Sequence, residues 1–302
     1  MVIPKLQPAQ SAENLRDRVA RFFRGPERSK KNDFQQSLSL SFNVDSDCSF
    51  DVPSQDVKVF IDFISDAMPS GDVYLFGGVL RDLALLGQKG FNSDIDLVVE
   101  GDWSHLIPYI LSLKAEKNKF GGYRLMVGGW PIDIWSAKET WAIKQGYVAY
   151  KGVSSLTETT VLNWDAILMN WRTRELIFRK NYFEEMSSRV LDIVLEQNPN
   201  PLGMAVRVFR HFCLKNAKKI TPFAARYMAN CSKLYSFEEI KNAELKSYGN
   251  AIVERAVHEF FEHIDTSTDK VIRHEFSLAS AVVNKSIDWP EYKQKGRVSF
   301  GL

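Results

Sequence analysis

The residues best suited to chemistry in this sequence lie between Val73 and Val99. Gly77 and Gly78 stand where an apolar run, residues 73–76, meets a helix-like segment. Because glycine has no side chain, backbone N–H groups can approach a phosphate closely at such a turn, and the dipole of the following helix favours negative charge. This pair is therefore either a simple tight turn or a turn on which a triphosphate could rest.

Three aspartates have positions that suit metal ions. Asp94 and Asp96 are two positions apart on an expected strand, where side chains alternate in direction, so both carboxylates point to one face. Hard oxygen ligands suit Mg²⁺, and two such ions can bind the attacking and leaving oxygens of a phosphoryl or nucleotidyl transfer. Asp133 stands between two isoleucines in an apolar strand, where a carboxylate is costly unless it is paired or binds a cation. The alternatives are a solvated strand end for the first pair and an edge or capping position for Asp133.

The elements that must position these residues mix helices with strands. Residues 73–99 predict a strand, a glycine turn, a helix and a second strand, and the apolar spacing of residues 57–68 predicts an amphipathic helix before them. The sequence also predicts a helix over 102–114 and two strands, 120–127 and 129–135, joined as a hairpin across Gly128 and Gly129.

Helical spacing dominates beyond Asn181. The predicted helices cover residues 183–195, 202–215, 222–233, 237–261 and 269–287. The domains we expect are a basic N-terminal extension at 1–55, a head at 56–181, a helical neck and body at 182–288 and a C-terminal tail at 289–302.

The whole chain has 302 residues, a length that suits about two domains, and a formal net charge of +2. No apolar run approaches the ~18 residues of a membrane span, and no signal-peptide core follows the N-terminus, so no membrane association and a cytoplasmic location are expected. The cysteines, Cys48, Cys213 and Cys231, are unevenly spaced and form no Cys-x-x-Cys pair, so neither a disulfide framework nor a zinc site is expected.

Basic residues cluster near the N-terminus. Between Arg16 and Lys31 there are seven basic residues and two acidic ones, Asp17 and Glu27. This segment is either a solvated helix and linker or an arm that contacts nucleic acid or a partner.

The order of these motifs resembles a known family. Gly-Gly-x-x-Arg-Asp at 77–82 followed by Asp-x-Asp at 94–96 is similar to the head of class II CCA-adding enzymes and bacterial poly(A) polymerases, in the polymerase-beta-like nucleotidyltransferase superfamily. The resemblance implies an α+β fold, with a polymerase-beta-like head of mixed sheet and flanking helices followed by an all-helical domain. It also implies that Asp94, Asp96 and Asp133 hold two Mg²⁺ ions. Asp133 resembles the third carboxylate of this fold, expected to be the general base or a ligand of the second metal.

The resemblance further implies nucleotide contacts. Gly77 and Gly78 seat the triphosphate, while Arg81 and Asp82 brace the turn or contact the nucleotide. Residues 163–169 resemble in part the family segment Arg-Arg-Asp-Phe-Thr-Ile-Asn-Ala, and Asp165 stands where the family has Asn. The nucleotide-binding residues expected downstream are Asp165, Arg207 and Arg210.

The family's neck motif is matched only in its second half. Arg207 and Arg210 match its Arg-x-x-Arg helix, but Gly203 or Met204 stands where an arginine that reads the incoming base is expected. On the same helix Arg207, His211, Lys215 and Lys218 share one face, which is either a solvated cationic surface or a surface for a triphosphate or nucleic acid strand. Because the expected base-reading arginine is missing, the sequence does not support ordered selection of CTP and ATP.

The function predicted is a template-independent, Mg²⁺-dependent nucleotidyltransferase (EC 2.7.7.-). It would transfer NMP or dNMP from a nucleoside triphosphate to a hydroxyl acceptor. The short head and neck resemble in outline nucleotidyltransferases of bacterial toxin and anti-phage defence modules, including the Hailong type that makes DNA oligomers, so an effector or antitoxin partner is expected. The alternatives are a tRNA or RNA 3′-end nucleotidyltransferase, of the CCA-adding or poly(A) type, and an inactive nucleotide- or RNA-binding module. Tyr292, in a tail without helical spacing, is a candidate protein primer whose alternative role is packing on the helical domain.

Overall fold

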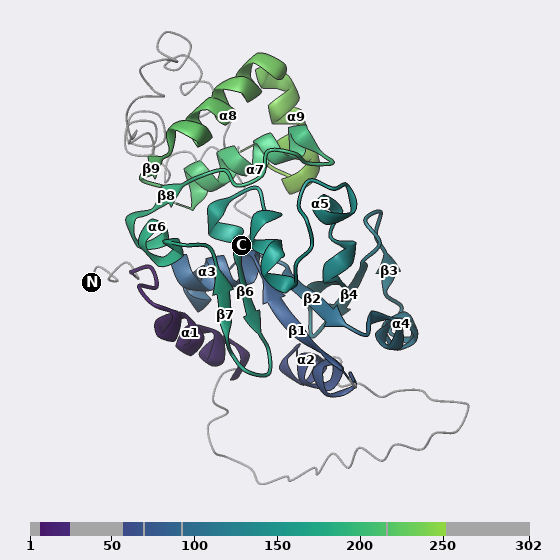
Figure 1. The fold of residues 1–302 in the computed structure, drawn as a ribbon. Helices are drawn as coiled ribbons and strands as arrows, with labels where there is room; N and C mark the ends of the chain where they lie inside the picture. Colours follow the sequence, from purple (N-terminus) through teal and green to yellow (C-terminus); the bar gives the residue numbers. More distant parts are fainter. Residues whose placement is uncertain (1–6, 25–56, 69, 92, 216, 252–302) are drawn as a thin grey trace.

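A mixed sheet of seven strands organises the head of the protein (Figure 1). The computed structural model describes residues 7–24, 57–68, 70–91, 93–215 and 217–251. The strands lie in the order β3-β4-β5-β2-β1-β6-β7. They are β1 (Gly71–Phe76), β2 (Ile95–Gly101), β3 (Glu116–Lys117), β4 (Tyr123–Val127), β5 (Trp130–Ser136), β6 (Ile167–Asn170) and β7 (Leu176–Phe178).

The predicted strand, turn, helix and strand of residues 73–99 are confirmed as β1, helix α3 (Gly78–Leu85) and β2. The turn at Gly77 has φ 60° and ψ −111°, a conformation that strongly favours glycine. Strand β1 pairs antiparallel with β2, and Phe76 lies opposite Asp96. Because an antiparallel partner begins where its neighbour ends, the glycine turn lies beside the aspartates at the start of β2.

Strands β2 and β5 are the parallel pair of this sheet. Their register places Asp96 directly beside Asp133. The predicted hairpin is confirmed: β4 and β5 are antiparallel and joined by Gly128 and Gly129, both with positive φ, as a tight two-residue turn requires.

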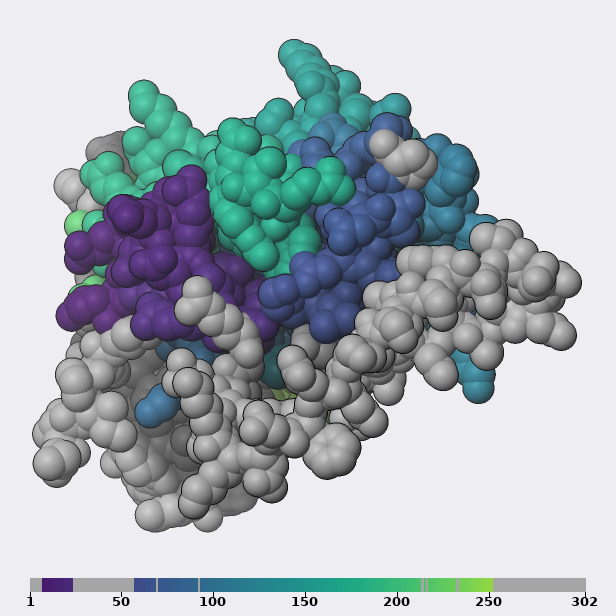
Figure 2. Space-filling view, turned by 90° about the horizontal axis from the view of Figure 1, so that it is seen from below, coloured from purple at the N-terminus to yellow at the C-terminus, as the bar shows by residue number. Residues whose placement is uncertain are grey.

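The flanking helices of the head include α1 (Ala12–Arg24), α2 (Val57–Asp66), α4 (Trp103–Ser112) and the short α5 (Trp141–Lys144). Predicted as part of an N-terminal extension, α1 packs on the head. Leu15 and Val19 are buried in the main core, and Arg18 donates to the carbonyl oxygen of Ala84 at 2.8 Å. Arg16 donates to the carbonyl oxygen of Arg174, and Figure 2 shows α1, in purple, continuous with the neighbouring surface. The rest of the basic cluster, from residue 25, lies outside the described residues.

Beyond Asn181 the described chain is mainly helical rather than all-helical as predicted. The helices are α6 (Tyr182–Ser188), α7 (Pro201–Leu214), α8 (Pro222–Leu234) and α9 (Phe237–Tyr248), and α7 to α9 gather at one end of the molecule (Figure 1). The mixed sheet, its flanking helices and this helical region confirm the α+β fold class.

Two helix predictions were wrong at their ends. The helix predicted over 183–195 ends at Ser188, because Arg189 adopts a left-handed conformation, φ 56°. The chain then forms β8 (Val190–Leu191), which pairs with β9 (Lys219–Ile220), a contact between distant segments that helical spacing does not reveal.

The other wrong end is in the helix predicted over 237–261: α9 ends at Tyr248 because Gly249 caps it with φ 69°, and residues 252–261 lie outside the described residues. The helix predicted over 269–287, the tail and Tyr292 lie outside the described residues. In the part of the chain that the structure describes, no helix is both long and apolar enough to cross a membrane.

Candidate active site

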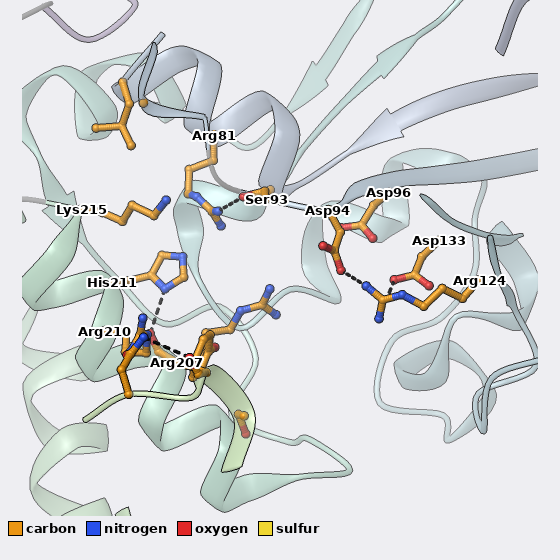
Figure 3. A pocket seen from close by; sticks show the side chains of 16 residues that line it. Arg81, Ser93, Asp94, Asp96, Arg124, Asp133, Arg207, Arg210, His211 and Lys215 are labelled. Carbon is orange, nitrogen blue, oxygen red and sulfur yellow. Dashed lines mark hydrogen bonds and ion pairs between the residues drawn. The ribbon is translucent and has the colours of Figure 1, made fainter. Parts of the chain in front are cut away.

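A cavity of about 810 Å³ lies between the carboxylates of the sheet and helix α7 (Figure 3). Asp94, Asp96 and Asp133 line one side, and Arg207 and His211 of α7, with Lys215 just after it, line the other. Gly78, at the first position of α3, and Arg81 also line it. Most of the residues predicted from distant sequence motifs thus border one cavity with acidic and basic walls, whereas Gly77, Asp82 and Asp165 do not line it.

The acidic wall follows from the strand register. Asp96 and Asp133 are neighbours on the parallel pair, and Asp94 immediately precedes β2. Burial, followed by the charge of Asp133, raises the pKa of Asp96 to about 7. Burial also raises the pKa of Asp133, although Arg124 opposes the rise. Two of the three carboxylates are therefore destabilised as anions and would be stabilised by a bound cation.

Arg124 of β4 supplies positive charge to this wall. It lies opposite Asp133 in the hairpin register. Its guanidinium forms an ion pair with Asp94 and lies 3.9 Å from Asp133 Oδ2 (Figure 3). Sequence reasoning missed Arg124, yet a two-residue turn at 128–129 pairs 127 with 130, and counting back from it pairs 124 with 133.

The donor atoms of the acidic wall fit a divalent cation such as Mg²⁺, since all are carboxylate oxygens. Among the residues described, no three Asp, Glu, His or Cys side chains converge closely enough to ligate one ion in their present positions. Three of these oxygens could ligate one ion only after side-chain movement, and Asp94 would then have to leave Arg124.

The glycine turn offers fewer free donors than the sequence suggests. The N–H of Gly77 donates to the carbonyl oxygen of Ile167 at 3.0 Å, which joins the turn to β6. Helix α3 then begins at Gly78, and no side-chain hydrogen bond caps it. A Cβ at Gly78 would lie 3.3 Å from the Ser93 side chain. The uncapped start of α3 is thus the part of the turn suited to an anion.

Arg81 and Asp82 form a buried ionic network beneath this turn. Arg81 donates to Asp82 Oδ1 at 2.9 Å and to Ser93 Oγ at 2.7 Å, and pairs with Asp165. Ser93 in turn donates to Asp82 Oδ2. Lys215, the residue that follows α7, donates to both carboxylate oxygens of Asp82, at 2.9 and 3.0 Å. The network brackets α3 between the loop before β2, the 3₁₀ turn η4 (Asn163–Asp165) and α7.

The cations beside Asp82 and Asp165 determine whether these two carboxyl groups are ionised. Burial on its own would raise the pKa of Asp82, but Arg81 and Lys215 hold that pKa well below its ordinary value. Burial likewise opposes ionisation of Asp165, and Arg81 outweighs it and lowers the pKa. Both aspartates are therefore carboxylates at neutral pH. Asp82 lies inside the network, and Asp165 lines a second cavity of about 180 Å³ that also reaches Gly77 and Asp96.

Helix α7 supplies the basic wall. Arg207 is exposed and borders both cavities. Arg210, predicted as a nucleotide contact, pairs with the buried Glu244 and donates to Asn250 Oδ1 at 2.9 Å, so it also joins α7 to the end of α9.

His211 is a cavity residue to which sequence reasoning gave no role beyond the basic face. Its Nδ1 lies 2.8 Å from the carbonyl oxygen of Arg207, which makes Nδ1 the protonated nitrogen. Its Nε2 is buried and has no hydrogen-bond partner among the described atoms. Burial, followed by the charge of Arg81, lowers the pKa of His211 to about 3. The ring is therefore neutral and presents an acceptor rather than a positive charge.

No protein-family model matches this chain, and no curated protein matches it. Solved structures do resemble it. A tRNA-processing enzyme with CTP has 15% identity and a TM-score of 0.46 over 70% of this chain and 57% of its own. The Thermotoga maritima CCA-adding enzyme complexed with tRNA has 18% identity and a TM-score of 0.46 over 67% and 48%. A tRNA nucleotidyltransferase with a primer tRNA and an incoming ATP analog has 13% identity and a TM-score of 0.44 over 79% and 80%.

The matched region spans about half the length of the first two of these structures. TM-scores below 0.5 at such identities define neither a family nor an activity for this chain.

Proposed function

We propose that this protein is a Mg²⁺-dependent nucleotidyltransferase that moves a nucleoside monophosphate from a nucleoside triphosphate to a hydroxyl acceptor. One observation carries the proposal: Asp96 and Asp133 are adjacent on parallel strands, beside the uncapped start of α3 and across one cavity from the cations of α7. Metal-binding carboxylates, an anion-binding helix start and a basic wall are the three groups that a bound triphosphate requires.

Each group has a role in the reaction. Bound to Asp94, Asp96 and Asp133, Mg²⁺ would stabilise negative charge on the phosphates and lower the pKa of the acceptor hydroxyl. A carboxylate oxygen of Asp133 accepts the proton of the acceptor hydroxyl. The hydroxyl oxygen then bonds to the α-phosphorus, the bond from that phosphorus to the bridging oxygen breaks, and pyrophosphate leaves.

The remaining residues bind and orient the triphosphate. The N–H groups at the start of α3, from Gly78, and the exposed guanidinium of Arg207 bind phosphate oxygens. Arg81 is buried and paired with Asp82 and Asp165, so it holds the turn in place and does not move when the substrate binds. Stabilisation of the leaving pyrophosphate by these donors is the main catalytic contribution of the protein.

The acceptor and the biological setting rest on sequence pattern. Since Gly203 and Met204 occupy the start of α7, where a base-reading arginine is expected, we favour an oligonucleotide product in a toxin or anti-phage defence module over CCA addition. Tailing of tRNA or RNA is the alternative acceptor chemistry. Priming by Tyr292 remains a proposal about a residue outside the described chain.

The test is incorporation of each labelled NTP and dNTP with Mg²⁺, with and without bulk RNA. We expect Asp94→Ala and Asp96→Ala each to lower incorporation at least ~100-fold, because removal of a metal ligand leaves developing charge uncompensated. The control is Asp72→Ala, at the far end of β1, where Asp72 lies 3.8 Å from Arg172. Activity within about tenfold of wild type in either active-site variant would refute the metal assignment.

Equilibrium dialysis with the same nucleotides tests the inactive binding module. Nucleotide binding without incorporation in the wild type, in every combination of substrate and RNA, would favour that module over an enzyme. Incorporation that is lost in Asp133→Ala while binding persists supports the role of Asp133 in proton transfer.

A further inference from the structure

Arg124 interacts with the carboxylates where a metal ion is expected to bind. Its guanidinium pairs with Asp94 Oδ2 and lies 3.9 Å from Asp133 Oδ2. In Figure 3 the guanidinium lies beside both carboxylates, on the same side of the cavity. Two of the three carboxylates of the acidic wall are therefore already interacting with a positive charge carried by the protein itself.

A guanidinium and a metal ion compete for these oxygens. A guanidinium beside these carboxylates repels a second cation and occupies the space next to their oxygens, whereas Mg²⁺ needs oxygens at about 2.1 Å in octahedral geometry. The described residues hold no ready-made group of three ligands, and the carboxylates paired with Arg124 are two of the three that such a group would need.

The Arg124 pairing is suited to reversible exchange. The side chain of Arg124 is 50% exposed and that of Asp94 is 43% exposed, and exposed ion pairs are weak because water screens them. By contrast, Arg81 is 3% exposed and bonded to two carboxylates, and Arg210 is paired with a carboxylate that is fully buried. Of these three cavity arginines, Arg124 leaves its partners with the least loss of buried contact.

We propose that Arg124 occupies the metal position in the free protein and leaves it when Mg²⁺ and a nucleoside triphosphate bind together. The triphosphate supplies the anion that Arg124 loses, because the side chain lines the same cavity and a guanidinium can bind two phosphate oxygens at once. Metal alone must displace Arg124 without such compensation. Arg124 thereby couples metal binding to nucleotide binding, an inference that rests on the proposed function of the site.

The experiment measures Mn²⁺ binding, by the loss of the free Mn²⁺ electron paramagnetic resonance signal, for wild type, Arg124→Ala and Arg124→Lys. Without nucleotide we expect Arg124→Ala to bind Mn²⁺ about fivefold more tightly than wild type, the scale of a lost exposed ion pair. Arg124→Lys should lie between them, because a lysine keeps the charge but not the fork of donors. The control is Arg172→Ala, since Arg172 is also half exposed, at 51%, and lies 3.8 Å from Asp72 at the far end of β1.

The same titration is repeated with a non-hydrolysable nucleoside triphosphate. Wild type should gain more Mn²⁺ affinity from the nucleotide than Arg124→Ala does, because only wild type has an arginine to release. Equal gains in the two proteins, or Mn²⁺ binding to Arg124→Ala no tighter than to wild type without nucleotide, would overturn the proposal.

The experiments distinguish failure of the Arg124 exchange from failure of the proposed function. Mn²⁺ binding that depends on Asp94 and follows the predicted order of Arg124 variants, in a protein that incorporates no nucleotide, supports the exchange and refutes the enzyme. Incorporation with Mn²⁺ affinity indifferent to Arg124 supports the enzyme and refutes the exchange. Mn²⁺ binding that is unchanged in Asp94→Ala overturns the exchange.

Discussion

Replacement of Asp96 by asparagine should make the metal-free protein more stable while abolishing its activity. Asp96 lies beside Asp133 on the parallel strands, and burial together with that neighbour raises its pKa to about 7 from an ordinary value of 3.8. At neutral pH and above, the folded state must therefore hold a charge that the unfolded state hydrates freely. An asparagine at this position would keep the shape of the side chain without the charge.

The size and sign of the effect follow from this shift. Below about pH 4 the carboxyl is protonated in both states and contributes no difference. Between about pH 4 and 7 the unfolded chain loses the proton that the folded protein keeps, so stability falls as pH rises. Above pH 7 the full shift of about three units corresponds to about 4 kcal/mol, which we reduce to about 2 kcal/mol because Asp96 is partly exposed.

The assay is urea denaturation of wild type and Asp96→Asn in EDTA, followed by tryptophan fluorescence. We expect Asp96→Asn to exceed wild type by about 2 kcal/mol near pH 8, and this difference to vanish near pH 4. Added Mg²⁺ should stabilise wild type more than the variant, since only wild type keeps all three carboxylates. A variant that is no more stable than wild type near pH 8, or equally favoured at both pH values, would refute the reasoning.

The remaining predictions concern the turn and its buried network. Lys215→Met should lower the free energy of unfolding by about 3 kcal/mol, because Asp82 stays buried with one cation fewer. The control is the exposed Lys218→Met, measured by the same urea denaturation. A loss in Lys215→Met no greater than in this control would contradict the prediction. Gly77→Ala should cost about 1–3 kcal/mol through its backbone at φ 60°, and thermal unfolding of the variant measures it. An unchanged melting temperature would show that the turn relaxes to accommodate a side chain.

Local relations made much of the site predictable from sequence. Gly77 and Gly78 end an apolar strand, and the spacing of Asp94 and Asp96 follows strand alternation, so each motif could be recognised from the sequence. The tight turn at 128–129 likewise fixed the hairpin register around Asp133. Each of these relations spans only a few residues.

The relations that were missed join distant segments. Arg124 meets Asp94, thirty positions away, only after the parallel pairing of β2 with β5 brings the hairpin beside the first two aspartates. The environment of His211 depends on Arg81, Arg207 and Lys215 together, and no periodicity reports which nitrogen of a ring lacks a partner. The strand β8 forms because it pairs with β9, and it occupies residues that were predicted to belong to the helix over 183–195.

The ionic network beneath the turn has a consequence for motion. Lys215 belongs to the end of α7 and Asp82 to α3, so a hinge between the two walls of the cavity would have to pull a buried ammonium away from a buried carboxylate. The pairing of β8 with β9 and the hydrogen bond from Lys218 N–H to the carbonyl oxygen of Arg189 resist the same opening. The width of the site between α3 and α7 is therefore set by folding, before any nucleotide arrives. If the proposed function holds, a nucleotide would have to fit a cleft of fixed width, and adjustment would be left to exposed side chains such as Arg124 and Arg207.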